Sequence, residues 1–343
     1  MEDKIYFSVT SYLGFEQEVL KVLNRNRSNV HTRQYLDWRY LGENSPHPPI
    51  IFWLHMLNGQ RVGMASLISR PYWMGDEAAR IWVLGDISLD KGLRGKGLGR
   101  KLFQFMNSFL EKEFCKGVFV IPNVAAQKTL TQTGWSQPYP FAWFILAIDP
   151  VATYFPHLIC NPVLVQFSKV WRQLIMKWFS LHCSNQFQLE KIDSFDTSFD
   201  DFWHVLEKDG LIIRDRSLVS LRWRFEQHPH HTYQIEAVKV HNKMVGYIVY
   251  EINKKGMCRI TDILALSVRF VRPMIALFLK KILKQKEIRT LRIKLNNNHL
   301  YCNQLKKLGF IKRIEKDVFQ VYDPHNIGLL KSKWFITVAD KDT

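Results

Sequence analysis

The spacing of apolar residues changes its period abruptly near residue 90. Residues 81–89 are mostly apolar and partly β-branched, which predicts a strand. A segment with four glycines follows and predicts a turn: Gly92, Gly95, Gly97 and Gly99. Apolar residues then recur every three or four positions from Leu102 to Leu110, which predicts an amphipathic helix. We interpret the rest of the chain around this strand, turn and helix.

Antiparallel strands are expected before this unit. Two apolar runs, Ile50–Leu57 and Val62–Ile68, flank the dipeptide Asn58-Gly59, which is a strong hairpin signal. Residues 1–30 predict one or two helices instead, and Glu16–Leu23 within them is amphipathic.

A second strand and helix are expected after the unit. Gly117–Ile121 reads as a buried strand that Pro122 ends. Ala125–Thr133 then predicts a helix, with Gly134 at its C-terminal cap.

The glycine-rich turn has the composition of a phosphate-binding loop. Backbone N–H groups without side chains between them can converge on one point, and the following helix adds partial positive charge. Four residues add full positive charge there: Arg94, Lys96, Arg100 and Lys101. The loop lacks the Gly-Lys-Ser/Thr ending of a Walker A motif and the spacing of GxGxxG. The alternative, an ordinary turn with solvated charges, is disfavoured by the flanking strand and helix.

The hexapeptide from Arg94 to Gly99 resembles the Arg/Gln-x-x-Gly-x-Gly/Ala loop of the GNAT acyltransferase superfamily. In that family the loop binds the pyrophosphate of acetyl-coenzyme A (acetyl-CoA). The resemblance implies these cofactor-binding residues: Arg94, Gly95, Lys96, Gly97, Leu98, Gly99 and Arg100. It also implies an α/β (α+β) fold, in which a mixed, largely antiparallel sheet is flanked by helices and a strand meander precedes the loop.

A second stretch of resemblance follows the strand at 117–121. Asn123, Ala126 and Gly134-Trp135 resemble the family pattern Asn-x-x-Ala…Gly-Phe, which implies that Asn123 binds near the pantetheine or the acetyl group. Many members carry a tyrosine seven residues after this asparagine, and it protonates the leaving thiolate. Leu130 occupies that position here, which puts the usual general acid in doubt.

The resemblance also implies how the strand 81–89 acts. Backbone groups at Ile87 and Leu89 would face the pantetheine arm, and the Leu89 amide would polarise the thioester carbonyl. Asp86 is the nearest carboxylate in sequence and is the candidate base for the acceptor amine, directly or through water. Its alternative is a structural role in bonding the backbone. His31 and His47 lie near the expected substrate side, although we favour an ordinary surface role for each.

The second half of the chain repeats the motifs of the first in the same order. Four pairs correspond: Leu36–Tyr40 with Leu221–Phe225, Val62-Gly63 with Val245-Gly246, Gly85–Ile87 with Thr261–Ile263, and Asn123…Gly134 with Asn298…Gly309. Four collinear matches indicate an internal repeat. Leu266–Met274 replaces the glycine loop in the second copy, so only the first copy is expected to bind the cofactor.

We therefore predict two tandem GNAT-like domains, the second degenerate. The division is an acyl-CoA-binding domain at 1–145, a linker with an amphipathic helix at 146–190, a second domain at 191–325 and a tail at 326–343. Lys333–Asp342 resembles the W-[YF]-x-T-x-x-D-x-D ending of tandem GNAT-like proteins that are often encoded with bacterial surface-polysaccharide genes.

Composition narrows the class of protein. A chain of 343 residues with 47% hydrophobic content has room for two packed domains. The five cysteines are scattered and include no CxxC pair, which predicts reduced thiols in the cytoplasm and no metal site. The net charge of +17 would attract anions. Since the basic residues are spread along the chain without a nucleic-acid module, nucleic acid is not the expected partner.

The segment Pro162–Leu181 predicts a basic amphipathic helix with proline at its start and several aromatic residues. Packing across the two domains is the interpretation that we favour. The alternative is contact with an anionic membrane surface, which would place a cytoplasmic protein at the periphery of the inner membrane. Pro150–Cys160, just before it, is expected to be loop-like.

These features predict an acyl-CoA-dependent N-acyltransferase. It would transfer the acetyl group of acetyl-CoA to a primary amine of a small molecule, such as an amino sugar, without a metal. Two alternatives stay open. Leu130 and the degenerate second copy support a non-catalytic acyl-CoA-binding or scaffold protein. Aminoacyl transfer from charged tRNA would suit the positive charge, but the intact glycine loop argues against it.

Overall fold

The computed structural model describes residues 5–42, 47–112, 116–208 and 210–341. Its helices are α1 (Glu16–Asn26), α2 (Arg33–Leu41), α3 (Leu98–Leu110), α4 (Val124–Gln132), α5 (Pro150–Tyr154), α6 (Pro162–His182), α7 (Ser198–Val205), α8 (Leu218–Leu221), α9 (Val268–Ile282) and α10 (Cys302–Lys307). Short helical turns are η2 (Lys91–Leu93), η3 (Pro156–Leu158), η4 (Arg222–Glu226) and η5 (Val338–Lys341). Its strands are β1 (Ile5–Ser11), β2 (Ile50–Met56), β3 (Arg61–Met74), β4 (Glu77–Leu89), β5 (Val118–Val120), β6 (Tyr139–Ala147), β7 (Phe187–Ile192), β8 (Leu211–Arg214), β9 (Gln234–Val240), β10 (Lys243–Ile252), β11 (Met257–Ala265), β12 (Thr290–Asn296), β13 (Ile311–Tyr322) and β14 (Lys333–Phe335).

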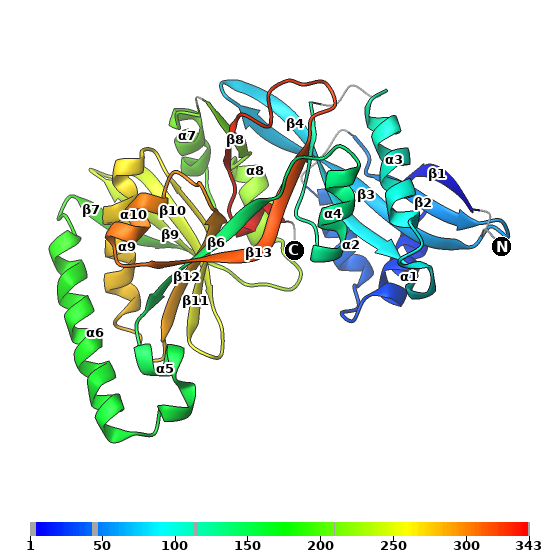
Figure 1. Ribbon diagram of the computed structural model, residues 1–343. Coiled ribbons are helices and arrows are strands. Elements are labelled where there is room, and N and C mark those ends of the chain that lie inside the picture. Colours follow the sequence, from blue (N-terminus) through cyan, green and yellow to red (C-terminus); the bar gives the residue numbers. More distant parts are fainter. Residues whose placement is uncertain (1–4, 43–46, 113–115, 209, 342–343) are drawn as a thin grey trace.

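These strands form one continuous sheet (Figure 1). Its main path runs β1-β2-β3-β4-β5-β13-β6-β12-β11-β10-β9-β7, and β8 joins β3 and β14 beside it. The pairs β4–β5, β11–β12 and β8–β14 are parallel, and the other pairs are antiparallel. The expected mixed, largely antiparallel sheet flanked by helices is therefore confirmed.

The two halves of the chain exchange a strand at the centre of the sheet. β13, near the C-terminus, pairs with β5 of the first half, through Gln320–Tyr322 and Val118–Val120. β6, from the first half, pairs along its length with β12 of the second. β6 and β13 also pair with each other. Each half thus completes the sheet of the other. The boundaries predicted for the two domains remain a prediction, but the halves do not form separate sheets.

Alternation along the strands builds two layers in the first half. Phe52, Ala65 and Leu67 face α3 and α4, where they pack against Leu102 and Met106. The residues between them face the opposite side, where α1 and α2 cover the sheet; this second layer includes Tyr12, Val19, Leu23, Leu36, Ile51, Trp53 and Met64. Alternate side chains of β2 and β3 therefore pack against the apolar faces of the helices, as the spacing of apolar residues predicted.

Most of the predicted elements are present. The hairpin turns at Asn58-Gly59, and Gly59 has a φ of +82°, which a side chain would strain. Helix α4 ends before Gly134, whose φ is +92°. The helix expected within residues 1–30 is present as α1, but β1, which precedes it, was not predicted. The expectation of a loop at Pro150–Cys160 was wrong, because most of this segment is helical as α5 and η3. The described cysteines Cys160, Cys183, Cys258 and Cys302 are free thiols, and Cys115 lies outside the described residues.

The repeated Trp motifs meet face to face. Trp38 in α2 and Trp223 in η4 stack with their ring centroids 5.0 Å apart. The indole N–H of Trp38 donates to the backbone carbonyl of Trp223 at 2.8 Å, and Trp223 donates to the carbonyl of Trp38 at 2.9 Å. Such reciprocal bonds are typical of a two-fold relation between equivalent elements. The element order β9-β10-β11-α9-β12-α10-β13 likewise follows that of β2-β3-β4-α3-β5-α4-β6.

Helix α6 lies along the outer edge of the second half, against α9 (Figure 1). Its buried side chains, Ile175 and Phe179, join the core of that half. One face of this helix therefore packs on the second half, whereas packing across the two domains was expected. Among the described residues no helix is both long enough and apolar enough to span a bilayer.

Candidate functional site

The glycine loop begins where β4 ends. Gly95 and Gly97 have φ values of +80° and +75°, a left-handed conformation that favours glycine. Gly97 is also the N-cap of α3. A Cβ atom built at Gly95, Gly97 or Gly99 would meet no atom within 4 Å. Backbone conformation therefore requires glycine at positions 95 and 97, and all three glycines leave open space beside the loop.

The N-terminus of α3 presents unused hydrogen-bond donors. In the part of the chain that the structure describes, no protein atom accepts a hydrogen bond from the N–H groups of Gly97, Leu98 or Gly99. The exposed side chains of Arg94, Lys96 and Arg100 surround them. Free N–H groups, a 13-residue helix dipole and full positive charges favour a phosphate or pyrophosphate at this point. The residues predicted for this loop are thus brought together.

β4 and β5 separate just beyond the centre of β4. They pair only from Trp82 to Leu84, opposite Val118–Val120. On its other edge β4 continues along β3, with a register shift that makes Asp86 and Ile87 the bulged residues. Asp86 there has a φ of +48°. The sheet therefore opens at residues 85–89 on the β5 side only.

The backbone of Leu89 faces this opening. Its carbonyl accepts a hydrogen bond of 2.9 Å from the Arg94 guanidinium, whereas the N–H of the next residue, Asp90, donates to Val62 of β3. Because the polar groups of successive strand residues alternate in direction, the N–H of Leu89 points away from β3. Ile87 lies in the bulge, where this regular alternation is interrupted, so its part in binding remains a prediction.

Asp86 lies buried at the opening, in a network of cations. Its Oδ1 accepts from Arg27 at 2.6 Å and from Arg39 at 3.0 Å, and its Oδ2 accepts from the Tyr40 hydroxyl at 2.8 Å. Burial would raise the pKa of Asp86, but Arg39, Arg27 and Tyr40 outweigh it and hold the pKa below its usual value. A carboxylate with both oxygens bonded and a low pKa is a weak base.

Asn123 and Leu130 occupy the two ends of their helix. The Asn123 side chain caps α4 by accepting from the N–H of Ala126 at 2.9 Å, and the residue borders the opening. Leu130 is fully buried between α4, α3 and the sheet. The position of the family's tyrosine therefore holds a core side chain without a proton to donate.

A cavity of about 280 Å³ lies at the opening, and both halves line it. The lining includes Arg27, Arg39, Asp86, Ile87 and Asn123 from the first half, and Asp317, Asp340 and Lys341 from the second. Sequence reasoning missed Arg27 and the three residues of the second half. Arg27 lies in a polar break after α1 with no motif around it, and only the exchange of β13 brings Asp317 to this place.

The two histidines that the sequence analysis singled out lie apart. His31 contacts the guanidinium of Arg27 and stacks on Tyr35. Burial and the charge of Arg27 lower the pKa of His31, so its ring favours the neutral form. His47 packs near Trp82 and borders a different cavity. Only His31 is therefore connected to the Asp86 network.

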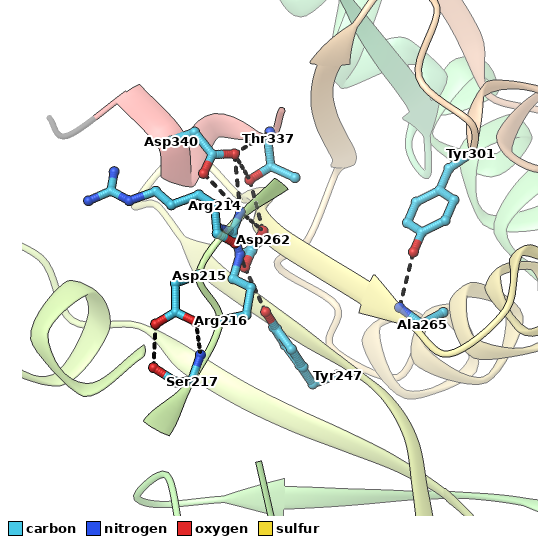
Figure 2. Close-up of polar contacts among 10 residues, drawn as sticks. All are labelled: Arg214, Asp215, Arg216, Ser217, Tyr247, Asp262, Ala265, Tyr301, Thr337 and Asp340. Carbon is cyan, nitrogen blue, oxygen red and sulfur yellow. Dashed lines mark hydrogen bonds and ion pairs between the residues drawn. The ribbon is translucent and has the colours of Figure 1, made fainter. Parts of the chain in front are cut away.

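In the second half the equivalent opening is filled. β11 pairs with β12 only through Ile260, and beyond it the Tyr301 hydroxyl accepts a hydrogen bond of 3.0 Å from the N–H of Ala265 (Figure 2). Ala265 corresponds to Leu89 in the repeat. Only Leu266 and Ser267 lie between β11 and α9, so the connection is short and holds no glycine. The second half thus has neither the free N–H nor the glycine loop of the first.

The C-terminal motif belongs to a buried network of this half. Arg216 donates to Asp262 at 2.8 Å and to Asp340 at 3.0 Å, and Thr337 donates to Asp262 at 2.8 Å (Figure 2). Tyr247 also donates to Asp262, at 2.9 Å. Thr337 and Asp340 are thus engaged in internal contacts, while Asp342, the last residue of the motif, lies outside the described residues.

Comparison with known proteins points to one family. Residues 17–135 match the acetyltransferase (GNAT) family. Among curated protein sequences none matches this chain. A solved structure from Enterococcus faecalis, described as a probable N-acyltransferase, is similar at a TM-score of 0.66 and 10% identity, over 94% of this chain and 72% of that one.

Two further solved structures share the fold. A GCN5-related N-acetyltransferase from Anabaena variabilis has a TM-score of 0.65 and 14% identity, over 96% of this chain and 75% of its own. Saccharomyces cerevisiae N-myristoyltransferase with bound myristoyl-CoA has a TM-score of 0.53 and 10% identity, over 94% of this chain and 80% of its own.

Proposed function

We propose that this chain, a member of the GNAT superfamily through residues 17–135, is an acyl-CoA-dependent N-acyltransferase. It would transfer an acetyl group from acetyl-CoA to a primary amine of a small molecule. One observation carries the proposal. Unpaired N–H groups at the start of α3 adjoin the point where β4 separates from β5. An anion site and an open strand edge are then available to one extended ligand.

Each part of the loop and strand has a role in this proposal. The N–H groups of Gly95–Gly99, with Arg94, Lys96 and Arg100, would bind the pyrophosphate. The opened edge at Ile87 and Leu89, together with Asn123, would hold the pantetheine arm. When bound, acetyl-CoA supplies an activated thioester for attack by the amine. The N–H of Leu89 would stabilise the negative charge that develops on the thioester oxygen.

We further propose that Asp86 is a positioning residue. It fixes the bulge in β4 and holds Arg27 at the cavity, since both of its oxygens are bonded. Because Leu130 is buried, a proton for the leaving thiolate would come from solvent. The second half would be a degenerate copy without its own cofactor, supported by the Tyr301 contact with Ala265.

The cavity suggests the class of acceptor. Asp317 is half-exposed there beside Lys294, and Arg27 and Lys341 add positive charge. A small cavity lined by both carboxylates and cations suits a polar amine that carries hydroxyl or anionic groups, such as an amino sugar. The aspartates would attract the ammonium form, which must lose a proton before attack.

Calorimetric titration of the full chain with acetyl-CoA tests the proposal. Gly97→Trp should raise Kd at least about hundredfold, because it removes two or more charge-assisted bonds of about 1.5–3 kcal/mol each. Gly75→Trp is the matched control. Gly75 also has a positive φ (+63°) and open space for a Cβ, but it lies in the β3–β4 turn. If both variants lose acetyl-CoA binding to the same extent, the cause is a folding defect and not the loss of the loop.

The remaining outcomes separate the alternative functions. Binding that Gly97→Trp abolishes, with turnover in an amine screen, would support the transferase. Binding without turnover of any amine would favour a non-catalytic acyl-CoA-binding protein. Absence of binding to the intact chain would refute the acyl-CoA proposal and would make a charged-tRNA donor the next hypothesis.

A further inference from the structure

Helix α6 carries a second apolar face that the protein leaves uncovered. One side chain of each turn points outward and forms a stripe along the helix: Val163, Phe167, Val170, Leu174, Trp178 and Leu181. The steps between them are four and three residues, so they share one face. Val163 is 75% exposed and Leu181 is 81% exposed. At 1.5 Å per residue the stripe is about 27 Å long.

The orientation of α6 is fixed by its opposite face. Arg172 donates to the backbone carbonyls of Leu283 at 3.1 Å and Ile288 at 3.0 Å. The indole of Trp171 donates to the carbonyl of Ala147 at 2.9 Å. Ile175 and Phe179 are buried beside these bonds. The helix therefore cannot turn its outer stripe inward without breaking its bonds to β6 and to the connection between α9 and β12.

The charged residues of the segment that carries the stripe have one sign. No aspartate or glutamate occurs between Asp149 and Glu190, while Lys169 and Lys177 are exposed on α6. Lys177 follows Leu174 by one turn, so it borders the stripe. Further exposed apolar residues precede the helix in the connection from α5: Phe155, Leu158 and Ile159. An apolar stripe rimmed by cations complements a surface that is apolar inside and anionic at its rim.

We propose that this stripe, Val163 to Leu181, docks on an anionic membrane surface. Side chains of the stripe would enter the boundary between headgroups and acyl chains, with α6 parallel to the surface, and Lys169 and Lys177 would reach the lipid phosphates. Phe167 and Trp178 suit this boundary because aromatic side chains favour it. Docking would hold the protein at a membrane surface through α6 alone.

A second copy of the chain fits the stripe less well. Two copies that met through it would bring two basic helices together, and each chain carries a net charge of +17. Like charges at the rim of a contact oppose association. A protein partner for this face would need an acidic rim that this chain itself does not supply next to the stripe.

Vesicle flotation of the full-length protein tests the proposal, with phosphatidylcholine alone and with phosphatidylcholine plus phosphatidylglycerol. We expect binding to the mixed vesicles only, and weaker binding at high salt. Leu174→Gln should weaken it about tenfold or more, because an apolar side chain no longer enters the lipid. Lys177→Gln should weaken it about fivefold.

Val205→Gln is the matched control. Val205 is 70% exposed on α7, away from the stripe, so its substitution should leave vesicle binding unchanged. Because all substituted side chains are exposed, the thermal unfolding midpoint of each variant should equal that of the wild type. Equal binding to both vesicle types, or no flotation at all, would overturn the proposal. A concentration-dependent dimer that Leu174→Gln dissociates would assign the stripe to a second copy instead and would also overturn it.

Discussion

Separating the two halves of the chain tests the strand exchange directly. A fragment of residues 1–190 keeps β5 but loses its neighbour β13, and it keeps β6 but loses β12. The complementary fragment, 191–343, loses β5 and β6 in turn. Each fragment would expose unpaired strand edges at the centre of its sheet, where backbone groups are least able to reach water. We predict that neither fragment folds alone.

The loss of stability can be estimated from the hydrophobic core where the two halves of the chain meet. Residues 191–343 supply six buried apolar side chains to a cluster that includes Phe119 and Phe141 of the first half: Ile212, Phe319, Val321, Leu329, Trp334 and Ile336. Each contributes about 1.5–3 kcal/mol on burial, which sums to roughly 9–18 kcal/mol. Whole domains are stable by only about 5–15 kcal/mol. Loss of this cluster alone would therefore unfold the fragment.

Circular dichroism melting and amide-proton dispersion by NMR would measure the effect. We expect 1–190 to show no cooperative transition until 191–343 is added or co-expressed. A cooperative transition of 1–190 by itself would refute the reasoning and would establish the predicted boundary as that of an independent domain.

A point substitution gives the same test without truncation. Phe319→Ala, in the last third of the chain, should destabilise the full protein by about 3–5 kcal/mol and should weaken its acetyl-CoA binding. Ile314→Ala is the control, since Ile314 is on the same strand but 68% exposed. If both substitutions have the same small effect, the exchanged strand does not stabilise the first half.

Three further predictions concern buried polar groups. Asp86→Asn should lower the free energy of unfolding in urea by about 3 kcal/mol, because Arg39 loses its buried counter-ion. If the pH profile of kcat/KM for this variant keeps its acidic limb, Asp86 has a positioning role; if the limb is lost, Asp86 is the base. Burial and the neighbouring histidines lower the pKa of His228 from 6.5 to about 4. Because the unfolded chain then binds this proton at a higher pH than the folded chain does, the free energy of unfolding should fall as the pH drops from 6.5 to about 4. His228→Gln should remove roughly 2 kcal/mol of that fall between pH 7 and pH 5, and an unchanged pH dependence would contradict this. Tyr301→Phe should cost about 1–3 kcal/mol by leaving the N–H of Ala265 without an acceptor, while calorimetry should still find one acetyl-CoA per chain; a second bound equivalent would contradict the filled opening.

The parts of the site that the sequence predicted are local in the chain. The glycine loop, its helix and the cap of α4 each depend on residues within about a dozen positions, where period and turn chemistry are informative. Gly95 and Gly97 could be recognised because a positive φ restricts the choice of residue. The sequence also predicts an internal repeat, because similar motifs recur in the same order in both halves, and the tandem arrangement remains a prediction.

The remaining parts depend on pairing across the whole chain. Nothing in the composition of β13 distinguishes a strand that stays in its own half from one that crosses to β5. The difference lies in which neighbouring strand it pairs with, and that pairing is set only when the whole sheet has folded. Asp317 and Lys341 could not be assigned to the cavity for the same reason. β1 was missed because its seven residues are half-exposed and give a weak alternation.

The second half bears on the role of Asp86. Asp262 is its counterpart in the repeat, and it too is buried at the same place on the equivalent strand, bonded to an arginine and a tyrosine hydroxyl. This half has no glycine loop, and Tyr301 occupies its opening. A carboxylate that exists only to deprotonate an acceptor would have no function there. Both halves share two features. In each, a strand separates from its parallel neighbour, β4 from β5 and β11 from β12, and an aspartate holds an arginine beside the separation. We therefore interpret the paired aspartates as the means by which each half keeps its strand apart, with chemistry added in the first half by the loop.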